Sequence, residues 1–147
     1  MSELQAINIS APEAYSIQQL PPNWALISIN DDSREELFPL QLDRTDKRIL
    51  TVKFEDIITG EIRNGRVCHP LRQDLAIEMV KFIEEYKDYN WVVHCHAGVS
   101  RSSAVALFIH LKYGHKLKDN FWLLSNPNPQ ALGMLTREGC RMGVLCF

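Results

Sequence analysis

The chain has few of the features that mark proteins for secretion, for a membrane or for a nucleic acid. Its four cysteines are too few for a disulfide scaffold, and they form no paired C-x-x-C pattern. No run approaches the ~20 apolar residues of a membrane-spanning helix, and the N-terminus lacks the basic start and apolar stretch of a secretory signal. The formal net charge is −2, without a block of like charges, which argues against a basic nucleic-acid-binding face.

The remaining composition is that of a single globular domain. The 147 residues are 46% hydrophobic and 23% charged, and no repeat or linker interrupts them. We therefore expect one domain spanning residues 1–147. It should be monomeric, without membrane or nucleic-acid partners, in a cytoplasmic, reducing compartment where free thiols persist.

Apolar patterns along the chain predict strands that alternate with helices. Residues 1–23 and 55–69 are expected to be mostly irregular, the first with weak strand character. Strands are expected at Trp24–Asn30, 48–54 and 91–95, and helices at 34–37, from Pro70 to 88, and at 100–113, 117–125 and 130–145. This order predicts an α/β fold with a central, mainly parallel sheet of about four to five strands flanked by helices.

The segment HCHAGVSRS, which begins at His94, joins a predicted strand to a predicted helix. Successive N–H groups of such a loop can form a concave anion site, and the following helix adds the positive end of its dipole. Gly98 permits the turn, and the fork of a guanidinium suits two phosphate oxygens. The residues expected to bind a phosphoryl group are His96, Ala97, Gly98, Val99, Ser100 and Arg101.

Cys95 is expected at the base of this loop as a nucleophile. The field that attracts phosphate also stabilises a thiolate, which would be aimed at the bound phosphorus. Ser102 is expected to offer its hydroxyl to the sulfur and help it depart in a second step. His94 is expected to hydrogen-bond near the cysteine backbone and fix its position.

The pattern His-Cys-x5-Arg-Ser resembles the protein tyrosine phosphatase superfamily. HCHAGVSRS is most similar to the small dual-specificity-like members, whose loop typically reads His-Cys-x-Ala-Gly-x-Ser-Arg-Ser. The resemblance is good from about residue 48 to 106 and vague toward both ends. It implies a dual-specificity-phosphatase-like fold, a phosphocysteine intermediate, no metal or cofactor, and hydrolysis of a phosphorylated protein or a small phosphomonoester.

The resemblance also implies a general acid, which in this family is usually an aspartate on a loop. Asp56 follows the alternating apolar residues of the strand at 48–54 and would protonate the leaving oxygen. Strand alternation predicts that Glu55 points to the opposite side. In the segment SNPNP, Asn128, or alternatively Asn126, is expected to brace the cysteine loop, as a similar segment does in small family members.

Several alternatives stay open at this point. The chain could be a phosphate-binding pseudophosphatase, a sulfur- or arsenate-handling enzyme, or a phosphatase of nucleotides, RNA, sugars or lipids. His96 and Val99 stand where phosphoinositide-directed relatives usually have lysines, which disfavours a multiply phosphorylated inositol ring. Pocket depth, which separates phosphotyrosine-only from dual specificity, is not encoded in the motif.

The remaining histidines, cysteines and tryptophans each allow a structural and a functional interpretation. A metal cluster would require ligands from the set Cys68, His69, His94, Cys95 and His96, although adjacent strand residues point to opposite faces. Cys68 is either an inert thiol or a redox partner of the loop cysteine. The chain's three tryptophans are expected in the core: Trp24, Trp91 and Trp122.

Overall fold

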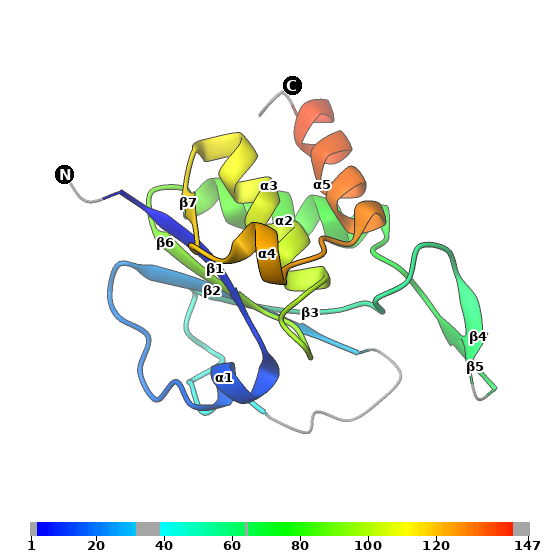
Figure 1. The fold of residues 1–147 in the computed structure, drawn as a ribbon, viewed down its shortest axis with the longest axis horizontal. Coiled ribbons are helices and arrows are strands. Elements are labelled where there is room, and N and C mark those ends of the chain that lie inside the picture. The colour runs from blue at the N-terminus through cyan, green and yellow to red at the C-terminus, as the bar shows by residue number, and fades with distance from the viewer. Residues whose placement is uncertain (1–2, 32–38, 64, 143–147) are drawn as a thin grey trace.

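A central sheet of five parallel strands organises the molecule (Figure 1). The computed structural model describes residues 3–31, 39–63 and 65–142. In spatial order the strands are β3 (Ile49–Lys53), β2 (Trp24–Asn30), β6 (Asn90–His94), β1 (Gln5–Ile9) and β7 (Lys116–Leu117). The predicted α/β class with a mainly parallel sheet is confirmed.

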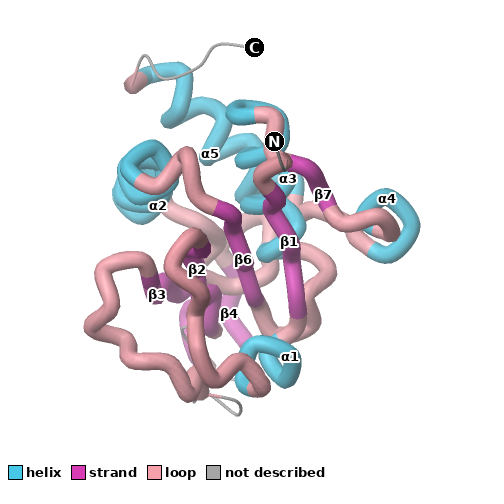
Figure 2. The backbone as a smooth tube through the Cα atoms, turned by 90° about the vertical axis from the view of Figure 1, so that its left-hand side faces the viewer, coloured by secondary structure: helices cyan, strands magenta, loops and turns pink. Residues whose placement is uncertain are grey.

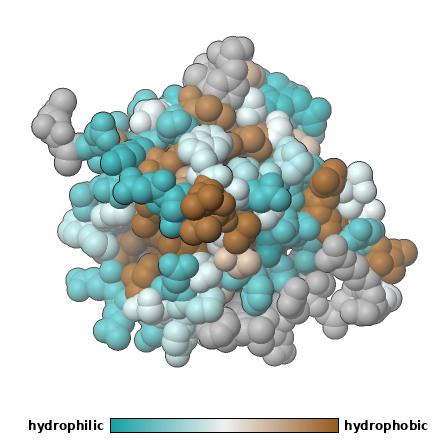
Figure 3. Space-filling model, viewed as in Figure 1, coloured by the Kyte–Doolittle hydropathy of each residue, from teal (hydrophilic) through white to brown (hydrophobic). Residues whose placement is uncertain are grey.

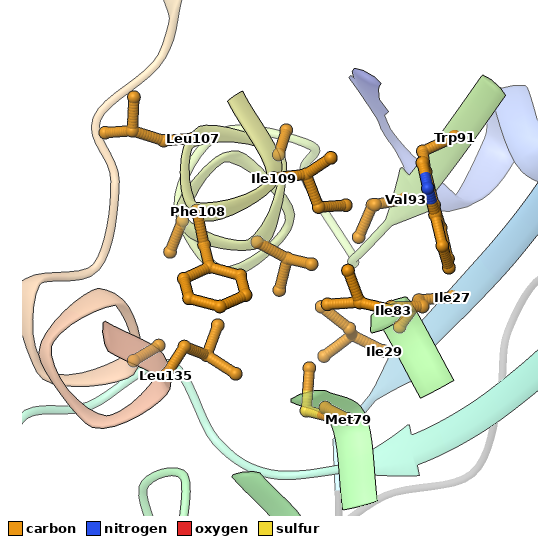
Figure 4. Packing of buried hydrophobic residues seen from close by; sticks show 14 of the residues in the cluster. Ile27, Ile29, Met79, Ile83, Trp91, Val93, Leu107, Phe108, Ile109 and Leu135 are labelled. Carbon is orange, nitrogen blue, oxygen red and sulfur yellow. The ribbon is translucent and has the colours of Figure 1, made fainter. Parts of the chain in front are cut away.

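Helices cover both faces of this sheet, as the two views of the chain show (Figures 1 and 2). They are α1 (Ala11–Tyr15), α2 (Gln73–Glu85), α3 (Arg101–Tyr113), α4 (Phe121–Leu124) and α5 (Pro129–Arg141). The larger core cluster lies between the sheet and the three long helices (Figure 4). A smaller cluster, which includes Ala14 of α1 and Leu26 of β2, covers the other face.

The middle of the chain follows its apolar pattern closely. The strand predicted at Trp24–Asn30 has the predicted bounds, and β6 is buried along its whole length. The helix after the cysteine loop ends where predicted, at the left-handed Gly114, which lets the chain leave the helix. These elements fix the position of the cysteine loop, because β6 enters it and α3 leaves it.

The N-terminal prediction is right only in part: β1 agrees with the weak strand character expected there, but Ala11–Tyr15 form a short helix that was not predicted. β1 is an inner strand that pairs with both β6 and β7. The signal for α1 was present: Ser10 and Glu13 form a reciprocal capping box, with Pro12 in the first turn. β1 was hard to see because it is short and has a polar residue, Asn8, at a fully buried position.

Three further expectations also need correction. Residues 55–69 contain a hairpin of β4 (Glu61–Arg63) and β5 (Arg66–Cys68). Its Ile62 and Val67 side chains are exposed and therefore carried no core pattern. α2 begins at Gln73 rather than at Pro70, after the N-cap residue Arg72. Trp122 is exposed rather than in the core, whereas Trp91 is buried and Trp24 is half-buried.

Three expected helices differ from the structure at their ends or lie partly or wholly outside the described residues. The helix expected at 117–125 is only the four residues of α4, preceded by β7. α5 ends at Arg141, before the expected end at residue 145, and residues 143–147 lie outside the described part. The helix expected at 34–37 also lies outside the described residues.

Candidate active site

The loop from Cys95 to Ser100 joins β6 to α3 at the carboxyl end of the sheet. Backbone hydrogen bonds attach it to the end of β1: the N–H of Cys95 donates to the Ile9 carbonyl at 3.4 Å, and that of Ala11 donates to the His96 carbonyl at 3.0 Å. Gly98 has φ +76°, and a Cβ there would lie 2.5 Å from backbone atoms of Ile9 and Ser10. The close approach of β1 therefore requires glycine at this position.

Two donors are positioned at the sulfur of Cys95, which is buried at the end of β6. The Gly98 N–H donates to Sγ at 3.2 Å, and the Ser102 hydroxyl lies 3.1 Å from Sγ. With a thiolate at this position, the hydroxyl is the donor in the second contact. The first residues of α3 follow immediately, so the positive end of the helix dipole also favours negative charge on the sulfur.

Arg101 is buried, and its guanidinium is held by fixed acceptors. Its Nη1 donates to Asp31 Oδ1 and to the Phe54 carbonyl, both at 2.7 Å. Its Nε has no hydrogen-bond partner within the described residues. Asp31 was missed by the sequence reading, although it directly follows β2 at the same end of the sheet, as Asp56 follows β3.

Asp56 and Asn128 meet next to the cysteine loop. Asp56 Oδ1 accepts hydrogen bonds from the Ser100 hydroxyl and from Asn128 Nδ2, both at 2.8 Å. The Asn128 N–H donates to the Ser100 carbonyl at 3.1 Å, and its Oδ1 accepts from the Ala131 N–H at the start of α5. One asparagine thus joins the expected acid, the loop and a helix N-terminus.

Asn8 supports the loop from β1, and sequence reasoning missed it. Its Nδ2 donates to the Gly98 carbonyl at 2.8 Å and to the Ser125 hydroxyl at 3.1 Å. Next to this contact, the Asn126 N–H donates to the Val99 carbonyl at 2.8 Å. The segment that follows α4 is therefore attached to the same loop.

His94 takes part in a buried chain of polar groups behind the cysteine. Its Nε2 lies 2.6 Å from the Ser28 hydroxyl, which also accepts a hydrogen bond from Asn30 Nδ2 at 3.2 Å. Its Nδ1 lies 3.5 Å from the Cys95 carbonyl oxygen. This histidine therefore lies where the sequence placed it, against the cysteine backbone, with a serine partner on β2 that the sequence did not reveal.

An open cleft of about 580 Å³ lies over these groups. All expected phosphate-binding residues except Gly98 line it, together with Cys95 and Asp56. Glu55 also lines the cleft, but it is buried whereas Asp56 is exposed. Both carboxylates follow β3, which ends at Lys53.

No group of three or more His, Cys, Asp or Glu side chains in the described residues could hold a metal ion, which removes support for the cluster considered above. Cys68 and Cys95 are both buried, and no disulfide joins them in the described part of the chain. No described helix has the length and apolar character to cross a bilayer.

Comparison with known proteins identifies the fold. No protein-family model matches the chain, and no curated protein does. Among solved structures, the chain is similar to the crystal structure of Tk-PTP in the active form, with a TM-score of 0.52 and 15% identity over 96% of this chain and 94% of that chain. It is also similar to human tyrosine phosphatase-like serine/threonine/tyrosine-interacting protein, with a TM-score of 0.46 and 19% identity over 82% and 79%. The chain has the fold of the protein tyrosine phosphatase superfamily.

Proposed function

We propose that the chain is a cysteine-dependent phosphomonoester hydrolase that acts on phosphotyrosine, and on phosphoserine or phosphothreonine, in proteins. The observation that supports this best is the position of one buried sulfur at the floor of a cleft. Cys95 has two hydrogen-bonding partners there, and a guanidinium and a carboxylate from other segments line the same cleft.

In the first step, the Cys95 thiolate attacks phosphorus and a sulfur–phosphorus bond forms. The bond from phosphorus to the leaving oxygen breaks, and Asp56 gives its proton to that oxygen. Arg101 and the loop amides stabilise the charge on the equatorial phosphoryl oxygens. Asp31 and the Phe54 carbonyl hold the guanidinium in place beforehand, so little reorganisation is needed during the reaction.

In the second step, water attacks the phosphorus of phosphocysteine. Asp56, now ionised, accepts a proton from this water, and the sulfur–phosphorus bond breaks with its electron pair returning to sulfur. The Ser102 hydroxyl, 3.1 Å from Sγ, donates a hydrogen bond to the departing thiolate. The products are an alcohol or phenol and inorganic phosphate, and the enzyme returns to its starting state.

The charge of the cleft lining favours substrates with one phosphate. Glu55 and Asp56 line it in addition to the carboxylate that pairs with Arg101. Like charges repel in such a site, so a polyanion such as RNA or a multiply phosphorylated inositol is disfavoured relative to a single phosphorylated side chain.

Hydrolysis of p-nitrophenyl phosphate tests the proposal. Cys95→Ser should lower kcat by at least about 10³-fold, because a serine hydroxyl in this site is a far weaker nucleophile than a thiolate. Cys140→Ser, on the half-exposed face of α5, is the matched control and should leave kcat unchanged. Vanadate should inhibit the wild type and EDTA should not. Activity that survives Cys95→Ser, or that EDTA abolishes while vanadate has no effect, contradicts the proposal.

A further inference from the structure

Helix α4 exposes three consecutive large apolar side chains, Trp122, Leu123 and Leu124, which we call the α4 patch. Their exposed fractions are 72%, 84% and 57%, whereas Phe121 of the same helix is fully buried. The helix projects from the body of the molecule beside β1 and β7 (Figure 2), and apolar residues gather on the surface over it (Figure 3). Large apolar side chains that are exposed next to one another commonly mark a site of interaction with another molecule.

The α4 patch is held in a defined conformation. The N–H groups of Leu123 and Leu124 donate to the Asn120 carbonyl at 3.2 and 3.0 Å. The buried ring of Phe121 packs edge-on against Trp122, with ring centroids 4.9 Å apart. The exposed side chains are therefore presented on an anchored turn of helix, which lowers the entropy cost of binding a partner.

The segment that follows the α4 patch is hydrogen-bonded to the candidate active site. Ser125, the residue after the patch, accepts a hydrogen bond from Asn8, which also holds the Gly98 carbonyl. Asn126 donates to the Val99 carbonyl, and both of these residues line the cleft. Val99 is itself 39% exposed, so a second exposed apolar side chain lies at the cleft, where the segment after the patch is attached.

We propose that the α4 patch is a docking surface for the polypeptide part of a phosphorylated protein substrate. It takes apolar side chains near the phosphorylated residue while the phosphoryl group occupies the cleft. The inference rests on the proposed function and deepens it, because a small phosphomonoester has no atoms that reach beyond the cleft. One tryptophan and two leucines offer roughly a few hundred Å², well below the ~800 Å² per partner of a stable dimer, which favours a peptide segment over a second copy.

Kinetics on paired substrates test the docking surface. We suggest phosphotyrosine peptides in which one leucine is moved through successive positions on either side of the phosphotyrosine, with an all-polar peptide as reference. In wild type, at least one leucine position should raise kcat/KM above the all-polar peptide. The variant Trp122→Ser/Leu123→Ser/Leu124→Ser should remove that gain, about tenfold, and leave p-nitrophenyl phosphate and the all-polar peptide unchanged.

Leu111→Ser is the matched control, because Leu111 is also an exposed apolar residue but lies near the far end of α3. This variant should leave kcat/KM unchanged for both p-nitrophenyl phosphate and the leucine peptide. The docking surface is contradicted if the triple variant loses kcat/KM equally on p-nitrophenyl phosphate and on the leucine peptide. It is also contradicted if no leucine position raises kcat/KM in wild type. If gel filtration instead shows a wild-type dimer that the triple variant converts to a monomer, the surface belongs to a second copy of the chain.

A binding measurement separates the failure of this inference from the failure of the proposed function. Trp122 is the exposed tryptophan, so leucine-containing phosphopeptide bound to the Cys95→Ser protein should shift its fluorescence to the blue and protect it from acrylamide. Trp122→Phe should abolish the change. Absent turnover of p-nitrophenyl phosphate would contradict the phosphatase but leave this readout intact. Peptide binding without a Trp122 signal would contradict the docking surface alone.

Discussion

The two ends of the central sheet both bury polar side chains, but they use them differently. At the carboxyl end, the side chains of Asn8, Asp31 and Asn128 support the cysteine loop, its arginine and the neighbouring aspartate. They come from segments far apart in the chain, and the groups they support surround an open cleft. At this end, buried polar side chains position groups that line the cleft and can bind a ligand there.

At the amino end, buried polar side chains form hydrogen bonds with backbone groups. Asn90 accepts from the Gln5 N–H at 3.0 Å and donates to the Asn23 carbonyl at 3.3 Å. His115 Nε2 lies 2.9 Å from the Tyr89 carbonyl. These contacts tie strand starts to loops and stabilise the fold. Buried polar groups therefore mark a functional site only where their contacts converge on an accessible reactive atom.

The largest expected effect is at the carboxyl end, for Arg101→Lys. An ammonium keeps the charge but cannot donate to Asp31, to the Phe54 carbonyl and in a bidentate manner to phosphate at once. We expect kcat for p-nitrophenyl phosphate to fall by about 10³-fold with little change in melting temperature. Arg137→Lys on α5 is the control and should have no effect. A loss below about tenfold would show that the guanidinium does not contact the reacting phosphate.

Asp56→Asn should have the next largest effect. An amide keeps the hydrogen-bonding shape toward Ser100 and Asn128 but cannot transfer a proton. We expect kcat to fall by about 10²- to 10³-fold for a phosphopeptide, because the leaving oxygen no longer receives a proton. Asp74→Asn, on the exposed first turn of α2, is the control. An unchanged rate would favour a sulfur- or arsenate-handling reaction, which needs no acid here.

At the amino end, Asn90→Ala should reduce stability and spare activity. It removes two hydrogen bonds to the backbone and leaves the Gln5 N–H at the start of β1 without its acceptor. Urea titration should show a decrease of about 1–3 kcal/mol in the free energy of unfolding, with kcat unchanged well below the melting temperature. Lys87→Ala, which breaks an exposed ion pair with Glu84, should cost less than about 0.5 kcal/mol. Loss of kcat in Asn90→Ala would erase the contrast between the two ends.

The smallest effect is the pH dependence contributed by His115. Burial lowers the pKa of this histidine below its usual 6.5, because the charged form loses its hydration. As the pH falls below 6.5, the unfolded chain binds a proton that the folded chain does not, so the free energy of unfolding decreases. We expect His115→Gln to lose less stability than wild type between about pH 7.5 and about pH 5 in urea titrations. Equal losses in the two proteins would contradict this assignment.

The sequence predicted those parts of the fold and site whose signal is local. β2, β6 and α3 are long or continuously apolar, and Cys95, Arg101 and Ser102 share one motif. Periodicity gave little for β1, which is short and has a buried asparagine, or for the hairpin, whose Ile62 and Val67 face solvent.

The supporting residues of the site were missed for a different physical reason. Asn8, Ser28 and Asp31 act on the cysteine loop through contacts with residues more than sixty positions away in the chain. Strand order brings them together, and no local pattern encodes strand order. The available signal was a polar residue at a buried strand position or directly after a strand. This signal indicates a candidate residue but not the residue that it contacts.

Mass spectrometry of the protein, quenched in acid during turnover of a phosphotyrosine peptide, can detect the proposed phosphocysteine itself. A phosphoryl group should appear on the proteolytic fragment of the protein that contains Cys95. It should be absent in Cys95→Ser and unaffected in Cys140→Ser. A phosphoryl group on another residue, or turnover with Cys95 unmodified at every quench time, would contradict this mechanism.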